Sequence, residues 1–140
     1  MPANTSPIFV LTPNATGTRI SAATLAPNGD AGTGAGPINI FTPGANGSRV
    51  DSIVITHAGT TAGSISADTI ARIYVTDSGA ANPRLLTEVQ LPTTTRSNLV
   101  VGSTQTINFV GGLFLGSGNF LAATQSTGTP FDYFVRGGNY

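Results

Sequence analysis

The sequence predicts an all-β protein: a single-domain, antiparallel β-sandwich of jelly-roll type, with about eight strands and an extended N-terminal arm. Short apolar/polar alternations recur along the chain, and no stretch has helical periodicity. Eighteen glycines and nine prolines in 140 residues interrupt these stretches at short intervals. Charged residues make up only 9%, and the Thr, Ser and Asn that take their place suit turns and strand surfaces. At this length we expect one core.

We expect residues 1–36 to form the arm and an irregular lead-in, and residues 37–140 to form the sandwich. The first part is rich in Pro and Gly, with short extended pieces at 8–11 and 19–24. It carries four apolar residues that could pack against a neighbouring subunit, namely Phe9, Val10, Leu11 and Ile20. The alternative is that these residues complete the sandwich of their own subunit.

The segment Pro43 to Thr56 is the centre of the predicted fold. Asn46-Gly47 favours a tight turn. The strand that follows places Ile53, Ile55 and His57 on one face. The same phrase occurs earlier, since residues 8–20 match residues 38–50 in their order of apolar strand end, Thr-Pro, small-residue turn, Gly, hydroxyl residue, Arg and β-branched residue.

Further strands follow at short intervals. The alternation predicts them at 38–42, 49–58, 70–77, 84–91, 105–110, 120–125 and 131–136. Residues 93–103 are expected to be a polar loop. Gly111 to Gly118 lacks the Lys and following helix of a phosphate loop, so we expect a β-bulge followed by a turn there.

A hairpin loop over residues 77–83 would fix the register of the two strands beside it. Arg72 would then lie opposite Glu88 and Tyr74 opposite Leu86 on one face. On the other face, Ile73 would lie opposite Thr87 and Val75 opposite Leu85.

The residues favour no catalytic, cofactor-binding or metal site, so we expect a protein that is not an enzyme. His57 is the single histidine and there is no cysteine, which leaves no recognisable triad or zinc ligand set. We expect His57 to be a strand-end residue hydrogen-bonded to backbone. The formal net charge of zero gives no field that would attract nucleic acid or an anionic membrane. The N-terminus lacks a secretory signal pattern, so we expect synthesis in the cytoplasm.

Most aromatic residues lie in apolar strand contexts and are expected in the core. Three are expected to face outward or into a subunit interface, namely Tyr74, Phe134 and Tyr140.

From residue 41 onward, several phrases resemble small bacteriophage virion proteins of the capsid decoration (cement) type. They are FTPGANGSRVDSIVI, TTAG, ARIYVTDSG, LLTEVQLP, LAATQST and FDYFVRGGNY. The resemblance covers about residues 38–140 and contains no catalytic motif. It implies a structural protein on the outer capsid surface of a virion, made in the host bacterial cytoplasm, that binds the major capsid protein and itself as a homotrimer. The alternative is a phage tail or fibre module that binds a host-surface glycan.

Overall fold

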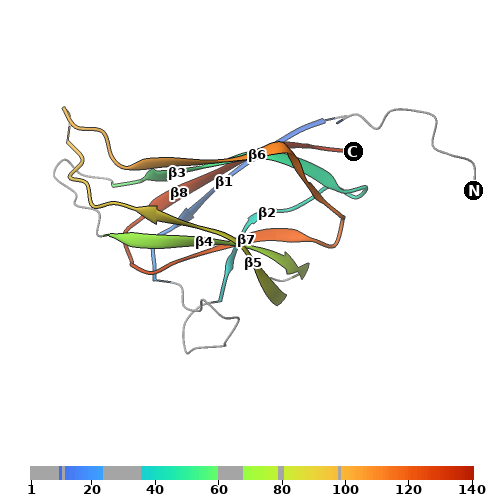
Figure 1. The fold of residues 1–140 in the computed structure, drawn as a ribbon, viewed down its shortest axis with the longest axis horizontal. Coiled ribbons are helices and arrows are strands. Elements are labelled where there is room, and N and C mark those ends of the chain that lie inside the picture. Colours follow the sequence, from blue (N-terminus) through green and yellow to red (C-terminus); the bar gives the residue numbers. More distant parts are fainter. Residues whose placement is uncertain (1–9, 11, 24–35, 60–67, 79–80, 98) are drawn as a thin grey trace, which may run out of the picture.

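The computed structural model of the chain consists of two four-stranded antiparallel sheets that pack on each other (Figure 1). The structure describes residues 10, 12–23, 36–59, 68–78, 81–97 and 99–140. The predicted all-β class, the antiparallel sandwich and the number of strands are confirmed.

The two sheets have the strand orders β1-β8-β3-β6 (sheet A) and β2-β7-β4-β5 (sheet B). The strands are β1 Thr12–Ile20, β2 Ile38–Phe41, β3 Ser48–His57, β4 Thr69–Asp77, β5 Ala81–Leu91, β6 Thr104–Leu115, β7 Phe120–Gln125 and β8 Phe131–Asn139.

The pairing of the strands is nested. β1 pairs with β8, β2 with β7, β3 with β6 and β4 with β5, each time antiparallel. The β3–β8 and β4–β7 pairs then join these units into the two sheets. Only the β4–β5 connection stays within one sheet, and every other connection passes from one sheet to the other.

The core lies between the sheets, as period-two alternation requires. Apolar side chains from both layers meet there, including Ile20, Phe41, Ile53, Ile55, Ile73, Leu121, Phe131, Tyr133 and Val135. Tyr133 donates its hydroxyl to Gln125 Oε1 at 3.3 Å, and burial raises its pKa. Its polar tip is thus hydrogen-bonded within the buried layer.

Residues 12–20 form β1, which is a strand of the sandwich. The domain boundary expected at residue 37 would therefore leave this strand outside the domain to which it belongs. β1 pairs with β8 over its whole length, from Thr12 opposite Asn139 to Ile20 opposite Phe131. The interior of the sandwich takes up Ile20 completely. For these residues the alternative of completing their own subunit's sandwich holds. The parts of the expected arm at 1–9, 11 and 24–35 lie outside the described residues.

The repeated phrase adopts two different structures. In the second copy the predicted turn is confirmed, because Gly47 donates its backbone N–H to Gly44 O at 2.9 Å. In the first copy the matching residues 14–17 are extended and pair with residues 134–137 of β8. Pro13 is compatible with this because β1 is an edge strand, where a missing N–H costs little. Asn14 further ties the strand down by donating to Asn139 Oδ1 at 2.9 Å.

The β4–β5 register is half as predicted. Arg72 lies opposite Glu88 and Ile73 opposite Thr87, but Tyr74 lies opposite Leu85 and Val75 opposite Arg84. The physical reason is a bulge that leaves Leu86 as an extra residue on β5. A shift of one residue exchanges the two faces. Leu86 therefore packs against the core while Leu85 is exposed.

The bulge predicted in the glycine-rich piece is confirmed in β6. Between the pairs Ser52–Asn108 and Val50–Leu113, four residues of β6 (109–112) stand against one residue of β3. Gly111 and Gly112 have φ values of 83° and 85°, which residues with a side chain rarely adopt. The predicted turn follows, with Asn119 N donating to Gly116 O at 3.0 Å.

Candidate functional site

His57 ends β3 inside the sandwich rather than at an open site. Its backbone N–H donates to Ser103 O at 2.8 Å, and its ring packs at 47° on Phe131 with centroids 5.5 Å apart. The expected hydrogen bond from the ring to backbone is absent among the described residues, where neither ring nitrogen has a partner. Burial, and secondarily the charge of Arg96, lower the pKa of His57. The side chain is therefore a neutral core residue near pH 7.

The described residues contain no group of three or more His, Cys, Asp or Glu side chains that could hold a metal ion. Nor do they contain a helix with the length and apolar character needed to cross a bilayer.

The residues predicted for an interface are not gathered in one place. Ile20 and Tyr74 are buried in their own subunit, so the surface exposure expected of Tyr74 is wrong. Tyr74 is 1% exposed, and its neighbours Thr76 and Ala122 on the same side of sheet B are buried as well, so this side of the sheet is covered there. Phe9 and Leu11 lie outside the described residues.

Three of the predicted interface residues do reach the surface. Val10 is 39% exposed and lies against Gly138, where an added Cβ would clash with Val10 Cγ1. Tyr140 is half-buried and stacks on Phe114 with centroids 6.4 Å apart and planes 12° apart. Phe134 is 45% exposed on the outer face of sheet A.

A set of exposed apolar side chains lies along β6 and the loop that leads into it. We call this set the apolar flank, and it consists of Leu99, Val100, Val101, Val110 and Phe114. Leu99 is 96% exposed, Val101 87% and Phe114 66%, while Val110 is fully exposed. All five of these aliphatic and aromatic side chains fall within one stretch of 16 residues.

Backbone hydrogen bonds fix the loop that carries one end of the apolar flank. Ser97 N donates to Val100 O at 3.0 Å, and the amides of Leu99 and Val100 both donate to Ser97 Oγ, at 3.2 and 3.1 Å. Ser103 N donates to Thr94 Oγ1 at 2.9 Å and anchors the loop at its return to β6. The loop thus presents Leu99 and Val100 from a defined backbone.

The β6 bulge presents the middle of the apolar flank. Val110 projects from the bulge at the free edge of sheet A. Gly112 lies under the side chain of Arg49, which an added Cβ would displace. The bulge interrupts the edge ladder and divides the regular part of β6 into residues 104–108 and 113–115.

The core is only partly covered along the edge formed by β5 and β6, the edge that also carries the apolar flank. Among the described residues, seven partly buried apolar ones pack against the core, and five of them belong to the edge strands β5 and β6, namely Leu86, Val89, Ile107, Phe109 and Leu113. On the opposite side, β1 and β2 are linked by Thr16 Oγ1, which donates to Ile40 O at 2.8 Å. The β1–β2 edge is thus held together by a hydrogen bond between the sheets, whereas the β5–β6 edge leaves core side chains partly exposed.

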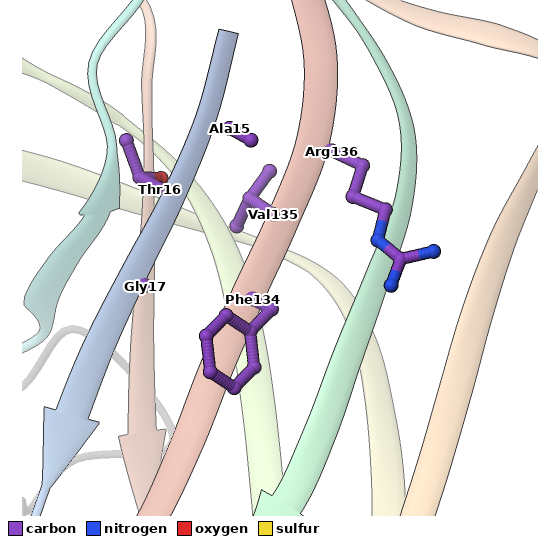
Figure 2. Close-up of a pocket in the computed structure, with 6 residues that line it drawn as sticks. All are labelled: Ala15, Thr16, Gly17, Phe134, Val135 and Arg136. Carbon is purple, nitrogen blue, oxygen red and sulfur yellow. The ribbon is translucent and has the colours of Figure 1, made fainter.

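A second surface feature is a depression of about 250 Å³ on the outer face of sheet A (Figure 2). Ala15 and Gly17 of β1 form its floor, and Phe134 and Arg136 of β8 stand beside them. An added Cβ at Gly17 would come within 2.9 Å of Phe134 Cε1, so the ring occupies space that a larger residue would need. Figure 2 shows the ring lying across the sheet and Arg136 extending away from it toward β3.

The apolar flank was missed by sequence reasoning although two signals for it exist. Leu113 and Leu115 point inward, so period-two alternation alone turns Phe114 outward. Three consecutive aliphatic residues at 99–101 are also anomalous in a loop expected to be polar. The depression depends on pairing Gly17 with Phe134, which the first-copy turn expected near Gly17 obscured.

No protein-family model matches this chain, and no match is found among curated proteins either.

Proposed function

We propose that the protein is a non-enzymatic bacteriophage capsid decoration (cement) protein, a jelly-roll subunit that binds the outer capsid surface. Its partners in this proposal are the major capsid protein and two further copies of itself in a homotrimer. The observation that carries the proposal is the apolar flank, a set of exposed aliphatic and aromatic side chains on one side of a sandwich of low charge.

The energetics of the flank support burial against protein. Removing a Val, Leu or Phe side chain from water is worth about 1.5–3 kcal/mol. Five such residues can therefore supply a large share of the driving force of a standard interface, which buries about 1,200–2,000 Å². With few ions on the surface, covering it also requires little charge desolvation.

The nested strand pairing supports the jelly-roll part of the proposal, because a jelly roll consists of eight strands wound as two Greek keys into two sheets. Trimeric symmetry suits a shell lattice, since three capsid units meet at its local threefold points. Three linked contacts hold far more strongly than one. The remaining arm in this proposal is residues 1–11, because residues 12–20 form β1.

Capsids that lack the protein provide the test. Purified protein is added to them, bound protein is quantified, and heat resistance of the shells is measured. We expect a complex with three times the 14.1 kDa chain mass and density of this size on the head. A monomer on the particle, or density on the tail, would overturn the proposal.

Surface variants identify the binding side. Leu99→Ser with Val101→Ser, and separately Phe114→Ser, should weaken shell binding by about tenfold or more while leaving the melting temperature nearly unchanged. Ile70→Ser is the matched control, since Ile70 is partly exposed on a central strand of sheet B away from β6. Flank variants that bind shells as tightly as the control would remove the flank from the mechanism.

A further inference from the structure

We infer that the depression on the outer face of sheet A binds an acidic saccharide, with the sugar's carboxylate at Arg136 and its pyranose ring on Phe134. The inference is independent of the proposed function, because it uses the face of sheet A and not the apolar flank. A volume of about 250 Å³ lies just below the roughly 300–1,000 Å³ of pockets for drug-sized ligands and suits one sugar unit.

Arg136 supplies the charge that selects an acid. Among the described residues, the other five arginines are each engaged: Arg19, Arg49, Arg72 and Arg84 in ion pairs, and Arg96 with Gly59 O. Arg136 has neither kind of contact there. Its planar guanidinium matches a carboxylate, with which it can form two parallel hydrogen bonds.

The two acids on this face near the depression, Asp132 and Asp51, are each engaged by an arginine, and Asp51 accepts from Arg49 Nε at 2.8 Å. Asp132 lies two residues before Phe134 on the same side of β8, but Arg19 holds both of its oxygens, at 2.7 and 2.9 Å. Among the described residues, no carboxylate is ion-paired with Arg136, since Asp132 and Asp51 pair with Arg19 and Arg49. Charge complementarity favours an anionic ligand at this end of the depression.

Phe134 supplies the platform. Its ring lies across the sheet with a face turned outward, as Figure 2 shows. The negative face of an aromatic ring attracts weakly positive C–H groups, such as those on the apolar side of a pyranose. Gly17 allows this position of the ring because it places no side chain beneath it.

The neighbouring rows of β3 and β6 also carry polar, uncharged side chains, which suit hydroxyl groups. In one row across the sheet, Ser52 of β3 lies opposite Arg136, and Asn108 of β6 lies opposite Ser52. In the next row, Val54 of β3 lies opposite Phe134, and Thr106 of β6 lies opposite Val54. Hydroxyl and amide side chains both donate and accept hydrogen bonds, as sugar hydroxyls do. A saccharide acid thus fits the site better than a bare inorganic anion.

A pair of probes that differ in one group tests the inference. Methyl α-D-glucuronide and methyl α-D-glucoside share a ring and differ only in the carboxylate, and acetate supplies a carboxylate alone. Each is titrated into the ¹⁵N-labelled full chain and followed by amide chemical shifts. We expect saturable shifts at residues 15–17 and 134–136 with the glucuronide, at an affinity on the order of 1 mM, and at least tenfold weaker binding of the other two.

Three variants separate the contributions. Arg136→Gln should abolish the preference for the glucuronide over the glucoside. Phe134→Ala should weaken glucuronide binding at least tenfold, and Gly17→Ala should weaken it by displacing the ring while both binding groups remain. Arg84→Gln, an exposed arginine paired with Asp77 in sheet B, should have no effect. Equal binding of glucuronide and glucoside, equal shifts with acetate, shifts outside the depression, or none at all would each overturn the inference.

Discussion

His57 shows how a single residue can fix a pH response. It is 1% exposed, its ring packs on Phe131, and it experiences the positive charge of Arg96. Both burial and that positive charge disfavour the imidazolium, so the pKa of His57 lies below its ordinary value of 6.5. The unfolded chain binds this proton more readily than the folded one.

We predict that stability falls as the pH drops below 6.5, the ordinary pKa of His57, and levels off below its folded pKa. Above pH 6.5 the histidine is neutral in both states, so its contribution is fully present there. Urea unfolding at pH 7.5, 6.5 and 5.5 measures the effect. His57→Gln removes the titrating group, and its stability should change much less over this range. An equally steep pH dependence in the variant would assign the effect to other groups.

The burial of individual side chains could be predicted where a strand alternates regularly. Ile53 and Ile55 are buried as their alternation indicates. Tyr74 also follows period two and points away from the core, yet it is buried, because the outer side of sheet B is covered at this position. Sequence alternation gives the face of a residue, but not whether that face is covered.

We predict that Ile53→Ala lowers the free energy of unfolding by about 2–5 kcal/mol, since it leaves a cavity between the sheets. Ile70→Ala deletes the same atoms from a side chain that is 39% exposed and should cost about 1 kcal/mol or less. Chemical denaturation of both variants checks this. Equal losses would mean that the interior can close around the missing methyl groups at residue 53.

At the scale of elements, register was predictable up to the first irregularity. The hydrophobic pattern correctly paired Arg72 with Glu88, but it carried no sign of the bulge at Leu86. Nearer the hairpin, Asn82 has a φ of 46° and Pro83 has no N–H to donate, so a second shift occurs there. The positions of such bulges in an edge strand depend on local backbone geometry, which the apolar/polar alternation does not encode.

We predict that the Arg72–Glu88 pair couples by only about 0–1 kcal/mol. The two side chains form an ion pair across β4 and β5, but that of Glu88 is half exposed. A double-mutant cycle with Arg72→Ala and Glu88→Ala in chemical denaturation measures the coupling. It should shrink further in 1 M salt. Coupling above about 2 kcal/mol would show that the pair is far better shielded from water than its exposure indicates.

At the scale of the whole molecule, the class, the strand number and the two-layer arrangement could be read from the sequence, but the place of β1 could not. The segment that forms β1 contains Pro13, Asn14 and Gly17, all typical of turns. It is extended because β8 offers nine consecutive partners and the interior accepts Ile20. Those partners lie more than a hundred residues away, which local pattern cannot reveal.

We predict that removing residues 1–9 changes the melting temperature little, whereas removing residues 1–36 prevents stable folding. The longer deletion removes β1, exposes the edge of β8 and empties the space of Ile20. Thermal unfolding and amide exchange of both truncated proteins test this. The Ile20→Ala variant, expected to lose about 2–5 kcal/mol, separates the loss of packing from the loss of the strand. A well-folded protein lacking residues 1–36 would contradict the role given to β1.

The nested pairing of the strands also orders the events of folding. The β4–β5 hairpin closes within a few residues, with Asp77 opposite Ala81, whereas Thr12 meets Asn139 only when almost the whole chain is in place. Each outer pair closes a longer loop, and the entropy of that closure is lost before its contacts form. We therefore expect the chain to assemble from its middle outward, over milliseconds to seconds. Until its last step, β8 would remain an unprotected edge, open to the strands of other molecules.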